Sequence, residues 1–456
     1  MQIFTRKWSE VSGGRFDPKF LNYTNKIRAK FPITFLNNLL KSSPMYGANE
    51  AGISRTSETQ PRYIRITDID DYGCLKEGLG ATAQTIQAQY MLEEDDILFA
   101  RSGATVGKTY IHKNIGYESF FAGYMIKFRV DSSKVLPYFV FIYTQLDIYK
   151  EWVKAIQRVS AQPNINAEEY KNLLIPVPPK EIQQKIIDIM DNAYLSKKQK
   201  ENEAKNILDS IDLYLLGELG IALPCKNTDL SHRIYTTKLS FISGKRFDCE
   251  YHQSYYNKLE EAISQGKYQT VIIRDNVFVN QQLESMEKYD FINYIDLSCI
   301  EKYNGLIKDT IIINSYFPSR ARQKVFKGDL LVSTLSGSMK AIALIEEYKE
   351  NLIASTGFFV ISRVKNISKG FLVSILRTDL FQILLKRETS GSIMSSINYN
   401  DFLNLKIPLP PLSVQEKIAN EIIKRKQKAL KLQKKAKDIL EYAKIQVEKI
   451  ILGEEQ

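Results

Sequence analysis

Ile175-Pro176-Val177-Pro178-Pro179 opens the stretch that decides the fold, and it recurs later in the chain as Ile407-Pro408-Leu409-Pro410-Pro411. Gln183 follows the first proline run at the same spacing as Gln415 follows the second. After each run, apolar residues fall mostly three or four positions apart and no proline interrupts them, which is typical of an amphipathic helix. Each proline run therefore predicts the start of a long helix.

The two helices are expected to pair with each other. At about 35 residues each, they would be roughly 50 Å long and would have little core of their own. Residues 182–221 hold five Lys against seven Asp and Glu, whereas residues 414–453 hold eleven Lys and Arg against five Asp and Glu. These opposite net charges favour pairing over two independently solvated faces. Ser413 and Glu416 have the spacing of a capping box, which predicts the start of the second helix.

Further repeated stretches cover the chain at nearly the same offset as the two proline runs. The matched stretches are Gly14–Asp17 with Lys245–Asp248, Arg62–Ile69 with Asp290–Leu297, Asp96–Phe99 with Asp329–Val332, Ser102-Gly103 with Ser336-Gly337, and Gly123 with Gly357. One offset held over so many separated matches indicates a tandem duplication. The period is too long for a solenoid, so each copy needs its own core.

Before each proline run, short stretches rich in Ile, Phe, Tyr and Val alternate with turn residues and predict strands. The expected strands are Tyr63–Ile69, Ile97–Ala100, Tyr124–Val130, Ile311–Tyr316, Leu330–Thr334 and Phe358–Val364, with one helix per copy at Pro137–Gln157 and Gly370–Lys386. The expected fold class is α+β, with two tandem α/β domains separated by two long antiparallel helices that form a coiled-coil-like spacer with pseudo-two-fold symmetry. The expected boundaries are 1–175 for the first domain, 176–222 for the central helix, 223–406 for the second domain and 407–456 for the distal helix.

The composition is that of a globular protein. The chain has 456 residues with 44% hydrophobic and 25% charged residues, which excludes disorder as a description of the whole. Its net charge of +11 is compatible with an anionic partner, although a solvated basic face is the commoner explanation of such an excess. The four cysteines are too few and scattered for a disulfide framework, and the first residues lack the apolar region of a signal peptide. We expect a reduced, soluble, cytoplasmic protein with no membrane partner.

Residues Gly103 to Thr109 resemble a phosphate-binding loop but lack the first glycine, whose position is taken by Ser102. Tyr110 and Ile111 follow and indicate a strand where such a loop would open a helix, so we interpret this stretch as a glycine-rich hairpin. No other catalytic motif is present, and Cys249 with His252 forms an isolated CxxH. No catalytic residue, metal site or cofactor is predicted.

Basic residues interspersed with Ser, Asn and Gln are frequent in the non-helical parts. Arg and Lys hold phosphates or read guanine, and Asn and Gln read adenine, so this mixture is typical of a DNA interface. Any one of them could equally be an ordinary exposed loop residue, and the hypothesis rests on the set. The candidate DNA-binding residues are Arg55, Arg62, Arg65, Arg101, Ser102, Lys108, Arg158, Ser160, Gln162, Asn164, Arg320, Arg322, Lys324, Ser336, Ser338, Lys340, Ser390, Ser392 and Ser395.

Together these motifs resemble the specificity subunit of type I restriction-modification systems. The resemblance rests on Arg15-Phe16-Asp17 and Arg246-Phe247-Asp248, the hairpins DDILFARSGATVGK and GDLLVSTLSG, the QPNIN stretch at 162–166, and the two IPxPPxxxQxK helix starts. It implies two target-recognition domains, each reading one half of a bipartite site in double-stranded DNA. It also implies docking of two methyltransferase (modification) subunits and a restriction/motor subunit, which would carry out adenine N6 methylation and DNA cleavage, with no active site in this chain.

The second copy has Ser395-Ser396-Ile397-Asn398 in place of QPNIN, which within this family implies two different half-sites. Three alternatives remain open from the sequence. The chain could serve a related stand-alone or type II adenine methyltransferase, it could be a P-loop-like NTPase that uses Lys108, or it could be a coiled-coil scaffold without a DNA role.

Overall fold

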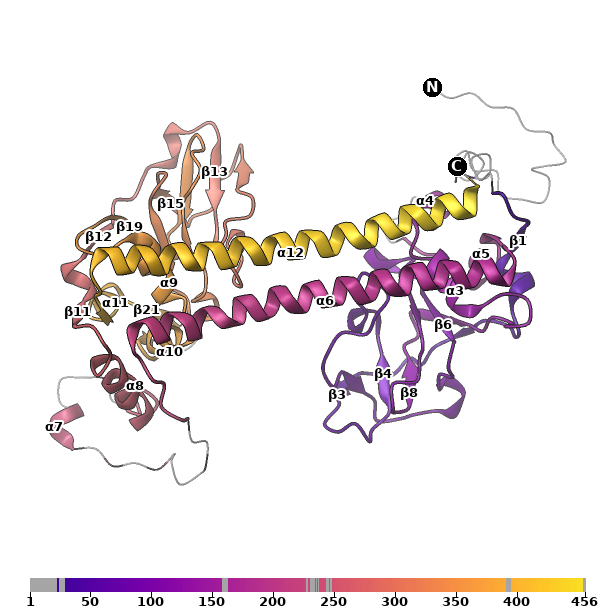
Figure 1. The fold of residues 1–456 in the computed structure, drawn as a ribbon, viewed down its shortest axis with the longest axis horizontal. Coiled ribbons are helices and arrows are strands. Elements are labelled where there is room, and N and C mark those ends of the chain that lie inside the picture. Colours follow the sequence, from indigo (N-terminus) through magenta and orange to yellow (C-terminus); the bar gives the residue numbers. More distant parts are fainter. Residues whose placement is uncertain are drawn as a thin grey trace. The chain divides into compact units, whose positions relative to one another are not determined.

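The computed structural model describes residues 23, 29–157, 163–226, 229, 234, 236, 238–242, 246, 248–390 and 395–453 (Figure 1). The chain divides into two compact units. Unit 1 comprises residues 1–200 and 434–456, and unit 2 comprises residues 201–433. This division passes through both long helices, so each unit contains one half of each helix. The domain boundaries predicted at residues 175, 222 and 406 separate domains from helices, which this division into units does not do. They stay a prediction.

The two long helices are present and are longer than expected. Helix α6 spans Lys180–Leu219 (40 residues) and helix α12 spans Leu412–Leu452 (41 residues). Helix α12 begins at Leu412, so Ser413 lies in its first turn and not at the N-cap position. The predicted capping box of Ser413 and Glu416 is therefore wrong.

Within each unit, the halves of α6 and α12 lie side by side and run in opposite directions (Figure 1). In unit 2, Lys417 forms an ion pair with Glu218 at 3.2 Å, and Arg425 Nη1 donates to Ser210 Oγ at 3.0 Å, which fixes an antiparallel register. The contact is mainly apolar. It joins Leu215, Leu219, Ile418 and Ile422 in unit 2, and Ile186, Met190, Val447 and Ile450 in unit 1. The exposed ion pair adds little, so apolar burial is the main stabilising term.

The described residues of unit 1 form two four-stranded sheets and three short helices, besides the halves of the long helices. One sheet has the order β2 (Met45–Tyr46), β9 (Met125–Phe128), β6 (Ile97–Ala100), β7 (Thr109–Ile111), and the other β3 (Ile53–Ser54), β5 (Ala81–Thr82), β4 (Arg62–Ile64), β8 (Ser119–Phe121). Strand β1 (Ile33–Phe35) pairs with β10 (Leu174–Pro176), and the helices are α3 (Pro137–Tyr143), α4 (Asp147–Ile156) and α5 (Ala167–Lys171). The core is aromatic, with Phe99, Phe128, Tyr149, Trp152 and Tyr170 buried together.

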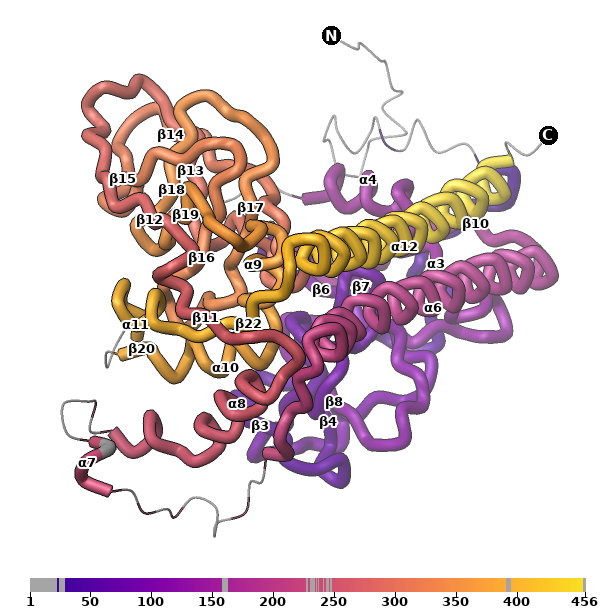
Figure 2. Tube along the Cα trace, turned by 60° about the vertical axis from the view of Figure 1, so that its left-hand side comes forward, coloured from indigo at the N-terminus to yellow at the C-terminus, as the bar shows by residue number. Residues whose placement is uncertain are grey.

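Unit 2 repeats the order of the first sheet, whereas its second sheet has its parallel pair in the centre; Figure 2 labels these strands. Its sheets have the orders β12 (Val277–Asn280), β19 (Phe358–Val364), β16 (Leu330–Ser333), β17 (Ile342–Leu344) and β14 (Ile311–Ile313), β13 (Ile292–Ile295), β18 (Leu352–Ser355), β15 (Ala321–Lys324). Two further pairs join β11 (Thr270–Ile272) to β22 (Lys406–Pro408) and β20 (Thr389–Ser390) to β21 (Ser396–Ile397). The helices are α7 (Leu239–Ile242), α8 (Ser254–Ser264), α9 (Lys369–Leu376), α10 (Asp379–Arg387) and α11 (Tyr399–Leu403). The expected fold class, a tandem α+β repeat with long antiparallel helices, is confirmed.

Most predicted strands are present, and two have the predicted ends, Ile97–Ala100 and Phe358–Val364. The strand predicted over Tyr63–Ile69 is wrong after Ile64, because Asp68 turns the chain by accepting a hydrogen bond from the backbone N–H of Arg65 at 3.0 Å. The single helices predicted near residues 137–157 and 370–386 are each two helices. In unit 2 the break lies at Thr378, whose side chain caps α10 by accepting from Phe381 N.

Hydrogen-bond registers correct the sequence matches between the copies. The parallel ladders pair Arg62 with Ser119 and Asn293 with Leu352, so Arg62 corresponds to Asn293 and the predicted match to Asp290 is shifted by three residues. Arg101 N donates to Tyr124 O, and Thr334 N donates to Gly357 O. Gly357 therefore occupies the position of Tyr124, and the predicted match of Gly123 to Gly357 is wrong by one residue.

The repeated glutamine after each proline run fastens the long helix to the domain. Gln183 Oε1 accepts from Leu136 N at 2.8 Å, and Gln415 Oε1 accepts from Ser368 N at 2.7 Å. Each amide also donates to a carbonyl of its own proline run. Both side chains are buried, so their hydrogen bonds fix where each long helix starts relative to the short helix beside it.

Candidate nucleic-acid interface

The hairpin β6–β7 of unit 1 is joined to the segment that precedes α5. Gly103 N donates to Pro163 O at 3.1 Å, and Ile165 N donates to Arg101 O at 2.9 Å. Ser102 and Asn164 face each other in the resulting antiparallel bridge. The structure thus brings the adjacent candidates Arg101 and Ser102 together with Asn164, a candidate from a distant part of the sequence. We call this contact the junction of unit 1.

One exposed tyrosine ring lies beside the Arg101 guanidinium, and a second exposed tyrosine is bonded to Arg101 through the backbone. The Arg101 guanidinium lies 5.0 Å from the centroid of the Tyr46 ring, and Arg101 N donates to Tyr124 O. Tyr46 is 39% exposed and Tyr124 is 40% exposed. Partial burial raises the pKa of the Tyr124 phenol. A guanidinium beside the accessible Tyr46 ring suits contacts to phosphates and base edges.

Tyr46 and Tyr124 were missed in the sequence analysis. They meet Arg101 because β2, β9 and β6 are neighbours in one sheet, with Tyr46 paired to Ile126 and Ala100 paired to Met125. The pairing of β2 with β9 joins segments that are far apart in the sequence, and no local motif marks it. The only local indication was that Tyr124 is the first residue of the predicted strand Tyr124–Val130.

Arg65 is held near this end of unit 1 by a bidentate contact. Its Nε and Nη2 donate to the two carboxylate oxygens of Asp68 at 3.0 and 2.9 Å. This hydrogen bonding raises the pKa of the Arg65 guanidinium. The side chain remains partly exposed, so Arg65 stays a candidate with a fixed orientation.

The structure gives Arg55 and Arg62 an internal role, and we remove them from the candidate interface. Both are buried. Arg55 donates to the carbonyls of Glu58, Gln60 and Leu79, and its guanidinium lies 4.0 Å from the Tyr117 ring centroid. Arg62 donates to Tyr117 Oη and Lys76 O. These arginines hold surface loops together, and their guanidinium groups are not accessible to DNA.

Lys108 is also tied to the protein. Its Nζ donates to Ile69 O at 3.0 Å and to Asp71 Oδ1 at 3.1 Å. Strand β7 begins at Thr109 and pairs with β6, which confirms the glycine-rich hairpin. A phosphate-binding loop would open a helix at this point, so the geometry does not support an NTPase.

Unit 2 contains the same junction with different side chains. Ser336 N donates to Ser395 O, Ile397 N donates to Thr334 O, and both bonds are 2.9 Å long. The hydroxyls of Ser336 and Ser395 are 2.5 Å apart. By these registers Ser336 corresponds to Gly103 and not to Ser102, and Thr334 occupies the position of Arg101. The junction of unit 2 therefore lacks the arginine and tyrosine found in unit 1.

An arginine approaches the junction of unit 2 from another strand. Arg320 O accepts a hydrogen bond from Thr356 N, and Thr356 directly precedes Gly357, whose carbonyl is bonded to Thr334 of the junction. The exposed Arg320 therefore lies next to the junction of unit 2. Arg322 on β15 is exposed and donates to Glu284 O, and Lys324 lies 5.6 Å from the Phe326 ring centroid. The two units thus present arginine from different strands.

The remaining candidate DNA-binding residues take no part in the hydrogen bonds that form the junctions, or lie outside the described residues. Lys340 forms an ion pair with Asp379 at 2.7 Å, Ser338 closes the turn of the hairpin, and Ser390 lies exposed on β20. Arg158, Ser160, Gln162 and Ser392 lie outside the described residues, as do Arg15-Phe16-Asp17 and Phe247 of the family motif.

The part of the chain that the structure describes has neither a cluster of metal ligands nor a membrane-spanning helix. There, no group of three or more His, Cys, Asp and Glu side chains could hold a metal ion. His252 of the isolated CxxH is engaged through Nε2 with Arg246 O. Among the described helices, none combines the length and apolarity needed to cross a membrane.

Two repeated domains, each with a polar junction and linked by long helices, define a modular DNA-recognition protein. A family model for the type I restriction modification DNA specificity domain matches residues 63–206 and 272–442. The chain therefore belongs to this family and is a type I restriction-modification DNA specificity subunit. Members of the family are generally non-catalytic, and DNA and other subunits of the system are its partners.

Individual relatives agree with this assignment. The MjaVIII specificity subunit of Methanocaldococcus jannaschii is 23% identical over 389 residues, covering 83% of this chain and 83% of the relative. The EcoKI specificity subunit of Escherichia coli K12 is 24% identical over 158 residues, covering 34% and 33%. A solved structure concerned with assembly and conformational transition of the type I R-M system has a TM-score of 0.53 at 14% identity, covering 92% of this chain and 98% of that one. At that identity the likeness shows the fold alone.

Proposed function

We propose that each unit reads one half of a bipartite site in double-stranded DNA through its junction. The supporting observation is that the same backbone hydrogen bonds build the junction in both units, while the side chains at equivalent positions differ. Arg101 and Tyr124 in unit 1 correspond to Thr334 and Gly357 in unit 2. Different donors and acceptors at equivalent positions select different base edges, so the two half-sites differ in sequence.

Exchange of residues 1–175 for the matching domain of a relative tests this proposal. We expect one half of the recognised sequence to change and the other half, with its distance, to stay the same. The recognised sequence is measured by selection from random DNA with the assembled complex. A change in both halves would show that the domains do not read independently.

We further propose that the chain docks two methyltransferase subunits and a restriction subunit, and that these partners carry out adenine N6 methylation and DNA cleavage. Leu213 on α6 is 78% exposed in unit 2, and Ile445 on α12 is 52% exposed in unit 1. The two positions are separated by the same offset that relates Gln183 to Gln415. An exposed apolar side chain at equivalent places in both repeats supports two equivalent docking surfaces.

Leu213→Asp and Ile445→Asp are each expected to remove one methyltransferase copy, because a carboxylate in an apolar contact is left unpaired. The double variant is expected to remove both copies. Native mass spectrometry of the complex gives the count directly. Asn206→Asp and Asp438→Asn exchange two exposed residues at equivalent positions of the same helices and should change nothing. Full occupancy in the double variant would place docking elsewhere.

A further inference from the structure

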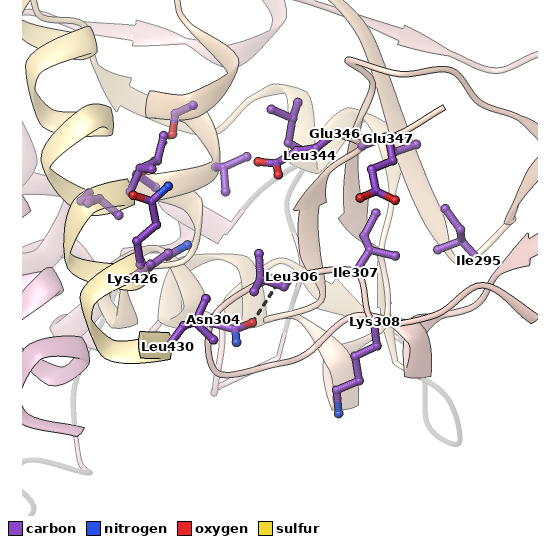
Figure 3. A pocket seen from close by; sticks show the side chains of 18 of the residues that line it. Ile295, Asn304, Leu306, Ile307, Lys308, Leu344, Glu346, Glu347, Lys426 and Leu430 are labelled. Atoms are coloured by element: carbon purple, nitrogen blue, oxygen red, sulfur yellow. Dashed lines mark hydrogen bonds between the residues drawn. The ribbon is translucent and has the colours of Figure 1, made fainter. Parts of the chain in front are cut away.

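Unit 2 contains a cavity of about 350 Å³ between its second sheet, α9 and α12 (Figure 3). Its walls are largely apolar and include Ile295, Leu306, Leu344, Val373 and Ile422. This volume lies within the range of small-molecule sites, which are typically apolar with a few fixed polar groups.

The corresponding place in unit 1 is occupied by aromatic side chains. Gln183 binds Leu136 as Gln415 binds Ser368, so residues of α3 and α9 correspond at the same offset as the two glutamines. Tyr138 in unit 1 then corresponds to Gly370, which lines the cavity in unit 2. Tyr138 stacks on Phe141 with ring centroids 5.8 Å apart and donates to Asp191 Oδ1 at 2.7 Å.

The same offset places Lys426 in unit 2 where unit 1 has Tyr194. Tyr194 packs against the core of unit 1, and its hydroxyl is buried. In unit 2 a glycine and a lysine thus line the cavity at the positions where unit 1 has two tyrosines packed against its core. The cavity therefore follows from specific differences between the repeats.

The lysine introduces a charge that the described residues leave unpaired. Lys426 lines the cavity, and no described carboxylate or carbonyl forms an ion pair or hydrogen bond with its Nζ. Burial and the nearby positive charge of Arg377 lower the pKa of Lys426, Glu346 opposes them, and together they bring the pKa to about 8. A half-buried ammonium without a hydrogen-bonded partner is unfavourable, and a bound anion would relieve it.

We propose that this cavity binds a small organic monoanion, a carboxylate with an apolar body, whose charge pairs with Lys426. The hydrocarbon part would lie against Leu306, Leu344 and Ile422. The cavity is lined by Lys308, Lys349 and Lys426 and by Glu346 and Glu347, a net charge of +1 that matches a monoanion better than a multiply charged ligand such as a nucleotide. This site is separate from the junctions and does not depend on their role in DNA reading.

Calorimetry of the full chain with 4-phenylbutyrate, 4-phenylbutanol and 4-phenylbutylamine tests the proposal. We expect the carboxylate to bind best and the amine worst. Lys426→Met should weaken carboxylate binding by about tenfold or more, because a charge-assisted contact is lost, and should leave alcohol binding unchanged. Lys426→Arg should retain the preference for the carboxylate. Thermal unfolding confirms that each variant is folded.

Lys426→Tyr restores the residue of unit 1 and should abolish binding of all three probes by filling the cavity. Lys424→Met removes an exposed charge two residues away on α12 and serves as the matched control. Absence of carboxylate binding, equal binding of acid and amine, or an unchanged affinity in Lys426→Met would each overturn the proposal.

Discussion

Replacement of Asp96 by alanine is expected to lower the free energy of unfolding by about 3–5 kcal/mol, because it removes one partner of a buried ion pair. Asp96 is fully buried and accepts from Arg129 Nε at 2.8 Å and from Arg129 Nη2 at 3.0 Å. Lys127, on β9, places its Nζ 3.8 Å from Asp96 Oδ2. Hydrogen bonding to Asp96 raises the pKa of Arg129, whereas burial lowers the pKa of Lys127.

We expect the lower end of that range for Asp96→Ala, because Arg129 is partly exposed and also pairs with Glu93 at 2.9 Å. Denaturant unfolding measures the loss, and hydrogen exchange should locate it in strands β6, β7 and β9. Asp329 is the equivalent residue of unit 2 and provides the control. It accepts from Phe326 N without a described ion pair, so Asp329→Ala should cost about 1 kcal/mol. Equal losses would show that the ion pair contributes no net stability.

Replacement of Arg101 by alanine is expected to weaken DNA binding by about 1–3 kcal/mol, or roughly 5- to 150-fold, if the guanidinium reads a base. The loss should be concentrated at one position of one half-site, because Arg101 projects from a single junction. The recognised sequence obtained by selection should relax at that position. The half-site read by unit 2 should stay unchanged.

Lys134→Ala is the control for Arg101, since it removes one exposed positive charge from unit 1 outside the junction. It should leave the recognised sequence as it is. A weakening by Arg101→Ala that is uniform over all DNA sequences, with a shallower salt dependence, would instead assign Arg101 to the phosphate backbone. An unchanged affinity would remove it from the interface.

Local patterns in the sequence predicted the long helices well, because helix periodicity and proline positions depend only on near neighbours. Strand Ile97–Ala100 was predicted for the same reason. The residue-by-residue match between the two repeats was predicted less well. Loops of different length, such as those after β4 and β13, shift this match, and no sequence motif shows where the extra residues lie. Arg55 appeared accessible in the sequence, yet its acceptor Leu79 lies 24 residues further along the chain.

In the candidate interface, too, features that depend on local sequence were predicted and features that depend on distant parts of the chain were missed. Arg101, Ser102 and Asn164 were predicted from residue type, and the structure brings them together. Tyr46 was missed because its place beside Arg101 follows from the order of strands in a sheet, which is a non-local property. Arg62 was included because arginine in a strand-rich region was treated as exposed, whereas its guanidinium is used inside the domain.

The principal bonds of each junction run from backbone to backbone, from Gly103 N to Pro163 O in unit 1 and from Ser336 N to Ser395 O in unit 2. Such bonds do not depend on the identity of the side chains. Mutations at these positions can therefore change what is recognised while the loop geometry survives. These backbone hydrogen bonds allow the recognised DNA sequence to change by substitution of junction side chains alone, because new side chains need not be matched by compensating changes in the core.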